Sequence, residues 1–196
     1  MRTGVRVVLA VGVVLSTGAL SGCFLNVFQT AQILRHGDVA FTVGMAVLDL
    51  APAVLTPQGR LAVGLSDGVE FGVQAGGMVN PGTGGVGFLG AIAELKLSLV
   101  DQPDALALAV GVGGGWSVIM GGWGLQASLY LDSNLWFLPL YVAYRPILPL
   151  GAEEFAPFHQ LAGGLCLDIS DKARLLLEAD FLGGLWSPGL ALEVQF

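Results

Sequence analysis

Charged residues are scarce in this chain. Only 12% of its 196 residues are Asp, Glu, Lys or Arg, and its mean hydropathy is +0.75. A typical soluble domain has about 25% charged residues, so this sequence does not supply a surface that faces water on every side. Either the protein has an unusually large core, or part of its outer surface faces lipid.

Basic residues, histidines and cysteines are scarcer still. Eight Lys and Arg stand against fifteen Asp and Glu, with a formal net charge of −7. Without a basic stripe for phosphates, we expect no nucleic-acid partner. Cys23, Cys166, His36 and His159 lack the paired spacing of a metal site, and no phosphate-binding glycine loop precedes a helix. The sequence therefore predicts neither a metal nor a cofactor.

The N-terminus has the pattern of an export signal. Two arginines in the first six residues precede an apolar run, residues 7–20, that is short for a membrane-spanning helix. The next residues complete the sequence Leu20-Ser21-Gly22-Cys23, which resembles the lipobox of bacterial lipoproteins. The resemblance implies cleavage before Cys23 and a covalent anchor on it, with diacylglycerol on its sulfur and a fatty acid such as palmitate on its new amino group. An ordinary signal peptide with a chance cysteine is the alternative.

Glycine is abundant, at 30 residues, and this argues against helices because each interior glycine costs about 1 kcal/mol relative to alanine. Residues 105–131 carry no charge and are long enough to cross a membrane as a helix. However, they are rich in glycine, and their apolar side chains alternate with a period of two. This period is typical of a β-strand.

The last residues show the alternation most clearly. Leu190, Leu192 and Val194 share one face with the final Phe196, while Glu193 lies on the other. A terminal strand that alternates in this way and ends on an aromatic residue resembles the C-terminal signal of bacterial outer-membrane β-barrels. The resemblance implies recognition of this strand by the barrel-assembly machinery.

Similar alternation recurs along the chain, and nearly every charge falls on the face opposite the large apolar residues. Between residues 105 and 113 the second face is only Ala and Gly, which suits a crowded interior, while bulky aliphatic residues suit hydrocarbon. We therefore predict an all-β fold: a closed antiparallel up-and-down transmembrane β-barrel. The predicted strands are 38–48, 59–65, 69–76, 87–99, 105–113, 123–132, 135–145, 158–169, 173–182 and 188–196. Eight strands is the rival, if 59–65 and 69–76 form one bent or bulged pair.

Three domains follow from these patterns: a lipoprotein signal peptide over 1–22, a lipidated tether or short plug over 23–37, and the barrel over 38–196. Short turns alternate with longer Gly- and Pro-rich links, as in outer-membrane barrels. An even strand count places both chain ends on the periplasmic side. We expect a protein of the bacterial outer membrane in contact with its lipids, with the N-terminus anchored on the periplasmic side.

Charges on the inner face form the candidate site. The acids are expected to pair with two bases, since bare carboxylates in one site oppose each other's ionisation. The set comprises Glu70, Glu94, Lys96, Arg174, Glu178, Asp180 and Glu193. It is either a structural ion network that fills the lumen or a cation-favouring constriction. Arg60 and Arg145 are expected near the outer strand ends, apart from this set.

The favoured function is a structural or narrow, porin-like conduit of the cell envelope, with no catalytic residue. One alternative is an enzyme acting on lipid A or a similar lipid through His159 in a loop, beside Glu153 or Glu154 and with Ser117 or Ser187. Another is a lipid-anchored, lipocalin-like binder of apolar ligands, with its apolar faces turned inward. The sequence leaves open whether the lumen is open or plugged.

Overall fold

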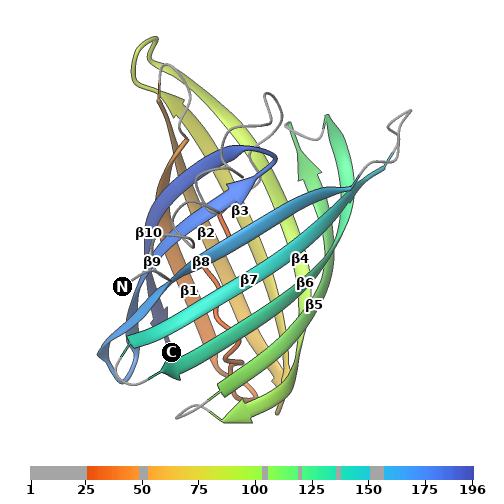
Figure 1. Ribbon diagram of the computed structural model, residues 1–196, viewed down its shortest axis with the longest axis vertical. Helices are drawn as coiled ribbons and strands as arrows, with labels where there is room; N and C mark the ends of the chain where they lie inside the picture. Colours follow the sequence, from red (N-terminus) through yellow and green to blue (C-terminus); the bar gives the residue numbers. More distant parts are fainter. Residues whose placement is uncertain (1–25, 49–52, 103–105, 119–120, 136–137, 151–156) are drawn as a thin grey trace, which may run out of the picture.

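Ten antiparallel β-strands close on themselves into one barrel (Figure 1). The computed structural model describes residues 26–48, 53–102, 106–118, 121–135, 138–150 and 157–196. Within these ranges no helix is long and apolar enough to cross a membrane. The predicted signal peptide and Cys23 lie outside the described residues. The strands are β1 (Val39–Leu48), β2 (Val54–Ser66), β3 (Val69–Asn80), β4 (Gly85–Gln102), β5 (Leu106–Ser117), β6 (Gly122–Leu135), β7 (Leu138–Pro149), β8 (Phe158–Ser170), β9 (Ala173–Leu182) and β10 (Leu185–Gln195).

Each strand pairs with the next along the chain, and β1 pairs with β10 to close the barrel. In this closing seam Ala40 lies opposite Gln195, and Ala46 opposite Gly189. β2 and β3 are separate strands joined by a tight turn, with a register shift between Gly64 and Ser66. The prediction of a closed, antiparallel, ten-stranded barrel is therefore confirmed, and the eight-stranded rival is wrong.

The barrel has two distinct ends. We call the end where β1 begins and β10 stops the turn end, because the connections there are the short ranges 67–68, 103–105, 136–137 and 171–172. The opposite end, with the connections 49–53, 81–84, 118–121, 150–157 and 183–184, is the loop end. Odd-numbered strands run from the turn end to the loop end, and even-numbered strands run back.

Apolar side chains cover the outside of the barrel. In β1, Phe41, Val43 and Met45 are about half exposed, while the residues between them are buried inside. Leu192 is exposed and Glu193 beside it is buried. A lipocalin-like barrel needs the reverse orientation, so that alternative is wrong.

Several strands reach further toward the loop end than the sequence indicated. β2 begins at Val54 and β5 continues to Ser117, where Gly- and Pro-rich links were expected. Pro57 lies opposite Met45, and Gly115 pairs with both Ile92 and Gly124. Pairing with neighbouring strands therefore outweighs the weak strand propensity of these residues.

Candidate functional site

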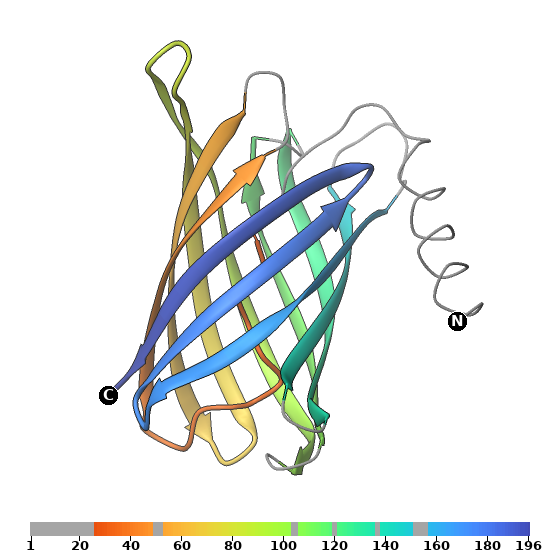
Figure 2. The ribbon, with the colours of Figure 1, turned by 60° about the vertical axis from the view of Figure 1, so that its left-hand side comes forward.

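The lumen holds a separate stretch of the chain, residues 26–34, which we call the plug segment. It is drawn in red to orange inside the barrel (Figures 1 and 2). Asn26 bonds to Ser187 near the start of β10, and Leu34 bonds to Glu70 near the start of β3. Because β10 starts at the loop end and β3 at the turn end, the plug segment runs along the barrel toward the turn end. Val27 is fully buried there, so residues 26–34 of the segment predicted as a tether or plug lie inside the lumen.

Carboxylates of the barrel wall hold the amide groups of the plug segment. Phe28 N donates to Glu178 Oε2 over 2.7 Å, and Ala31 N donates to Asp132 Oδ1 over 2.7 Å. Leu34 N donates to Glu70 Oε2 over 3.1 Å. A buried peptide group without a strand partner must find another hydrogen bond, and charged acceptors form the stronger ones.

Donors from the wall hold the carbonyl groups of the same segment. Lys96 Nζ donates to the Thr30 and Gln32 carbonyls over 3.1 and 3.2 Å. Gln74 Nε2 donates to the Asn26 carbonyl over 2.6 Å. The wall therefore recognises both the donors and the acceptors of an extended main chain.

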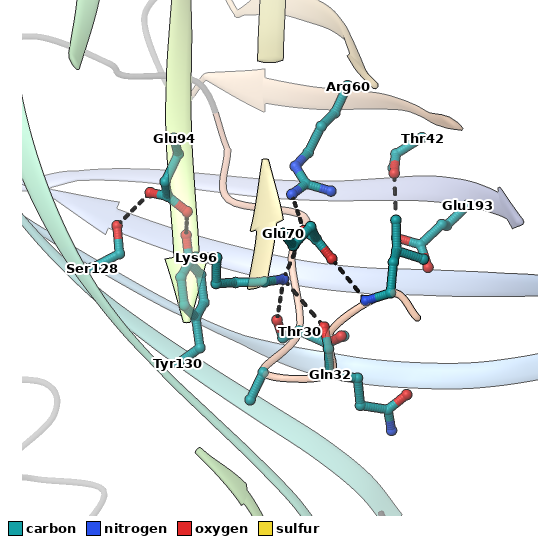
Figure 3. Close-up of polar contacts among 12 residues, drawn as sticks. Thr30, Gln32, Thr42, Arg60, Glu70, Glu94, Lys96, Ser128, Tyr130 and Glu193 are labelled. Atoms are coloured by element: carbon teal, nitrogen blue, oxygen red, sulfur yellow. Dashed lines mark hydrogen bonds and ion pairs between the residues drawn. The ribbon is translucent and has the colours of Figure 1, made fainter. Parts of the chain in front are cut away.

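Glu70 joins the plug segment to an ion cluster (Figure 3). Its Oε1 lies 2.5 Å from Arg60 Nη2 and 3.1 Å from Lys96 Nζ, while its Oε2 accepts from Leu34 N. All three charged side chains are buried. A buried ion pair is stabilising only when its remaining hydrogen-bonding capacity is also used, and here the plug segment uses part of that capacity.

Glu94 forms a second cluster, made with the wall alone. It accepts from Tyr130 Oη at 2.5 Å, Ser128 Oγ at 2.7 Å and Gln126 Nε2 at 2.7 Å, all from β6. Arg145, which is 1% exposed, donates to Tyr130 Oη over 3.4 Å. A carboxylate with three donors and a nearby guanidinium is held firmly in the wall.

The acids of β9 and β10 fall into two groups. Glu178 also accepts from Tyr141 Oη at 2.9 Å, and the adjacent inward residue Asp180 accepts from Gln160 Nε2 at 2.9 Å. Glu193 lies nearer the turn end, where Arg174 Nη1 is 3.9 Å from its Oε1. The seven predicted site residues are thus spread along the lumen, with Glu70 beside Lys96 and Glu193 beside Arg174.

The prediction missed three charged residues that face the lumen. Arg60 and Arg145 were expected apart from the set, but both are buried in it because β2 and β7 extend past these positions. Asp132 was expected as the last residue of its strand and was left out of the set, but β6 continues to Leu135, and the Asp132 carboxylate accepts from the amides of Ala31 and Gln32. The alternation of Gln58, Arg60 and Ala62 along β2 was the available signal for Arg60.

Phe28 is seated on the closing seam of the barrel. Its backbone φ of 39° lies in the left-handed region, which is uncommon for a residue with a side chain. A Cβ atom added to Gly44 would lie 2.7 Å from its ring, and one added to Gly189 would lie 2.6 Å from it. Buried Ala46 and Ala191 complete this seat. Only very small residues on β1 and β10 leave room for the ring.

The two ends of the lumen differ in character. At the loop end, an apolar cluster of inward side chains includes Leu89, Ile92, Ile147 and Leu182. At the turn end, a cavity of about 440 Å³ is lined by charged and polar side chains. The charged residues around it include Arg35, Arg60, Glu70, Lys96, Arg174 and Glu193. The lumen is therefore a polar vestibule at one end, with the plug segment and an apolar layer beyond it.

The expected loop histidine is on the outer face of the barrel instead. His159 lies within β8, and its Nδ1 is 2.7 Å from Tyr144 Oη, with the two rings stacked 6.0 Å apart. Ser117 and Ser187 are buried in the wall, and Ser187 Oγ bonds to Asn26 Oδ1 in the lumen. The expected serine–histidine arrangement is not formed, and Glu153 and Glu154 lie outside the described residues. No group of three or more His, Cys, Asp or Glu side chains in the described ranges is placed to hold a metal ion.

Comparison with known proteins relates this chain to others by fold. No protein-family model matches it, and no curated protein matches it. Among solved structures, the KdgM porin is 8% identical, with a TM-score of 0.50 over 80% of this chain and 99% of that chain. The N-terminal β-barrel domain of Pseudomonas aeruginosa OprF is 12% identical, with a TM-score of 0.41 over 83% of this chain and 100% of that domain. Outer membrane protein OprG of the same organism is 12% identical, with a TM-score of 0.37 over 86% and 99%. The chain has the fold of a bacterial outer-membrane β-barrel.

Proposed function

We propose that this protein is a plugged, porin-like barrel of the bacterial outer membrane, carrying a lipid anchor on Cys23. The plug segment closes the lumen in the resting state, and the barrel becomes a narrow conduit for small solutes when that segment leaves. One observation carries the proposal: residues 26–34 lie in the lumen, where wall side chains bind their main chain.

The outer surface supports a location in a membrane. Large apolar side chains are exposed on every strand, for example Leu61 at 55% and Leu129 at 44%. Burying such surface in lipid is favourable by about 25 cal/mol for each Å² removed from water. Trp123 and Trp186 are exposed near the loop end, and Phe196 near the turn end. Aromatic residues at both ends of an apolar band are typical of membrane-spanning barrels.

The size of the inward side chains supports a removable plug. A purely structural barrel of this size can fill its interior with large side chains, yet many inward residues here are alanine. They include Ala40, Ala46, Ala62, Ala107, Ala109, Ala143, Ala162 and Ala191. The space beside them holds a segment that is joined to the barrel at only one of its ends within the described residues. Hydrogen bonds hold it, and polar lumen groups can bond to water instead once it leaves.

Planar-bilayer recordings test the proposal with three forms of the protein. The full chain should insert with little or no steady conductance, whereas a variant lacking residues 26–34 should show discrete open-channel steps. Phe28→Ala, which removes the ring from the seam, should show intermediate, flickering openings. Steady openings of equal size in all three forms would contradict a closing role for the plug segment, and a closed deletion variant would contradict a conduit.

A further inference from the structure

The barrel wall binds the plug segment mainly through its main chain. The plug residues whose amide or carbonyl groups bond to the wall are Asn26, Phe28, Thr30, Ala31, Gln32 and Leu34. By contrast, the side chain of Gln29 is buried, yet its Oε1 atom has no hydrogen-bond partner among the described residues. Main-chain groups are common to all peptides, so most of this binding does not depend on the sequence of the bound segment.

The polar groups of the wall are divided as a peptide requires. The acceptors along the plug segment are the carboxylates of Glu70, Asp132 and Glu178, and the donors are Lys96 and Gln74 (Figure 3 shows Glu70 and Lys96). An ionised carboxylate only accepts and an ammonium group only donates, which matches the amides and carbonyls of a main chain. The hydroxyl groups of a sugar both donate and accept, so a sugar does not require this division.

One side chain of the plug segment has a pocket of its own. The amide of Phe28 donates to Glu178 Oε2, the atom that also accepts from Tyr141 Oη. Its ring packs in a buried cluster with Ala46, Tyr141, Leu176 and Ala191. A ring pocket beside a fixed amide acceptor sets the register of a peptide in the lumen, because the ring and the amide of one residue must fit together.

The cavity at the turn end leads to the same main-chain groups. Its lining includes Thr30, Gln32 and Leu34 of the plug segment, together with Glu70 and Lys96 of the wall. A molecule in this cavity therefore lies beside wall groups that bind the plug segment. A peptide can replace the plug segment there one hydrogen bond at a time, without leaving the buried charges unpaired.

We propose that the lumen is a binding site for extended peptides that carry an aromatic residue, and that the plug segment occupies this site in the resting state. The inference rests on the proposed function and names the class of solute that the conduit takes. Peptide binding and release of the plug segment are then a single exchange, because both chains need the same carboxylates and the same ring pocket.

Peptide binding is measured by calorimetry in detergent on the full-length Phe28→Ala chain, whose own plug segment lacks the ring while the wall is intact. The probe is a synthetic peptide with the sequence of residues 26–34, blocked at both ends. One control peptide is N-methylated at the amides of Phe28, Ala31 and Leu34, and a second has alanine at the position of Phe28. In a third, alanine replaces Gln29 and Gln32.

The probe and the third peptide should bind with similar affinity, because their main chains and rings are the same. The N-methylated peptide and the peptide without the ring should each bind roughly tenfold more weakly or worse, since hydrogen bonds to charged groups or a buried ring are lost. The unsubstituted full chain should bind the probe more weakly than the Phe28→Ala chain does. Equal binding of the probe and the N-methylated peptide would overturn the inference.

Absence of probe binding to both the folded Phe28→Ala chain and the variant lacking residues 26–34 would also overturn it, even if that variant conducts as the proposed function expects. Calorimetry does not depend on conductance. Probe binding by a barrel that never conducts would therefore support the peptide site and contradict the conduit.

A pair of wall variants supplies a second readout in the variant lacking residues 26–34. Gln74→Leu removes the donor to the carbonyl of Asn26, so it should weaken binding of the probe several-fold. Gln126→Leu is the matched control, because Gln126 Nε2 donates to Glu94 of the wall and not to the plug segment. Equal affinities for the probe in the two folded variants would contradict main-chain recognition by the wall.

Discussion

At the scale of single residues, two lumen carboxylates each bind side chains of the barrel wall and also accept a main-chain amide of the plug segment. Glu70 balances the charges of Arg60 and Lys96 and also accepts an amide of the plug segment. Glu178 likewise accepts from Tyr141 and from Phe28. These carboxylates therefore couple the stability of the wall to the position of the plug.

Glu70→Gln should destabilise the folded barrel strongly. Removing one partner of a buried ion cluster leaves charge without compensation, which typically costs about 3–5 kcal/mol. The temperature at which the folded barrel unfolds in detergent, followed by its electrophoretic shift, should fall clearly. Glu193→Gln is the control, because Arg174 lies 3.9 Å away and is partly exposed. An equal fall in the unfolding temperature of both variants would contradict a larger contribution of Glu70 than of Glu193 to the stability of the barrel.

At the scale of elements, the closing seam of β1 and β10 is shaped around the plug segment. Gly44 lies opposite Ala191, and Ala46 lies opposite Gly189. These four small residues form a notch where larger inward side chains would meet the ring of Phe28. The seam that closes the barrel is thus also the seat of its plug.

Gly189→Val should open the barrel in bilayer recordings without removing any hydrogen bond of the wall. The added methyl groups take the space of the Phe28 ring, so we expect open-channel steps that the full chain lacks. Gly59→Val, which adds the same atoms where no close contact exists, should remain closed. If a folded Gly189→Val barrel shows no open-channel steps, the Phe28 ring does not hold the plug segment in the lumen.

The same elements show what the sequence could and could not predict. The alternation in β9 and β10 predicts their faces, because one side meets lipid and the other the lumen. The plug segment has no such period, since its bonds are with side chains of distant strands such as Glu178 and Lys96. The strand that holds Asp132 was likewise expected to end there, because Asp132-Ser133-Asn134 is typical of a turn, whereas the β6–β7 pairing continues to Leu135 opposite Leu138.

At the scale of the whole molecule, the lumen carries more acid than base. Among the described residues, six acids and four bases have side chains turned into it. These are Glu70, Glu94, Asp132, Glu178, Asp180 and Glu193, with Arg60, Lys96, Arg145 and Arg174. Rings of acidic side chains favour cations in membrane pores. The open form should therefore prefer cations.

The preference is measurable as a reversal potential across a salt gradient. The variant lacking residues 26–34 should give a cation-selective potential, and adding Glu94→Gln should move it toward zero. Adding Asp67→Asn, a change in the β2–β3 turn outside the lumen, should leave it nearly unchanged. An anion-selective open form would contradict the assignment of these acids as the lining of the path.

Hydrogen–deuterium exchange of the full chain in a lipid bilayer tests the central claim, that the plug segment lies in the lumen, most directly. The amides of Phe28, Ala31 and Leu34 should exchange slowly, as strand amides do, because each donates to a buried or half-buried wall carboxylate. Exchange of all three at the rate of an unstructured peptide, beside protected strands, would contradict the plugged barrel.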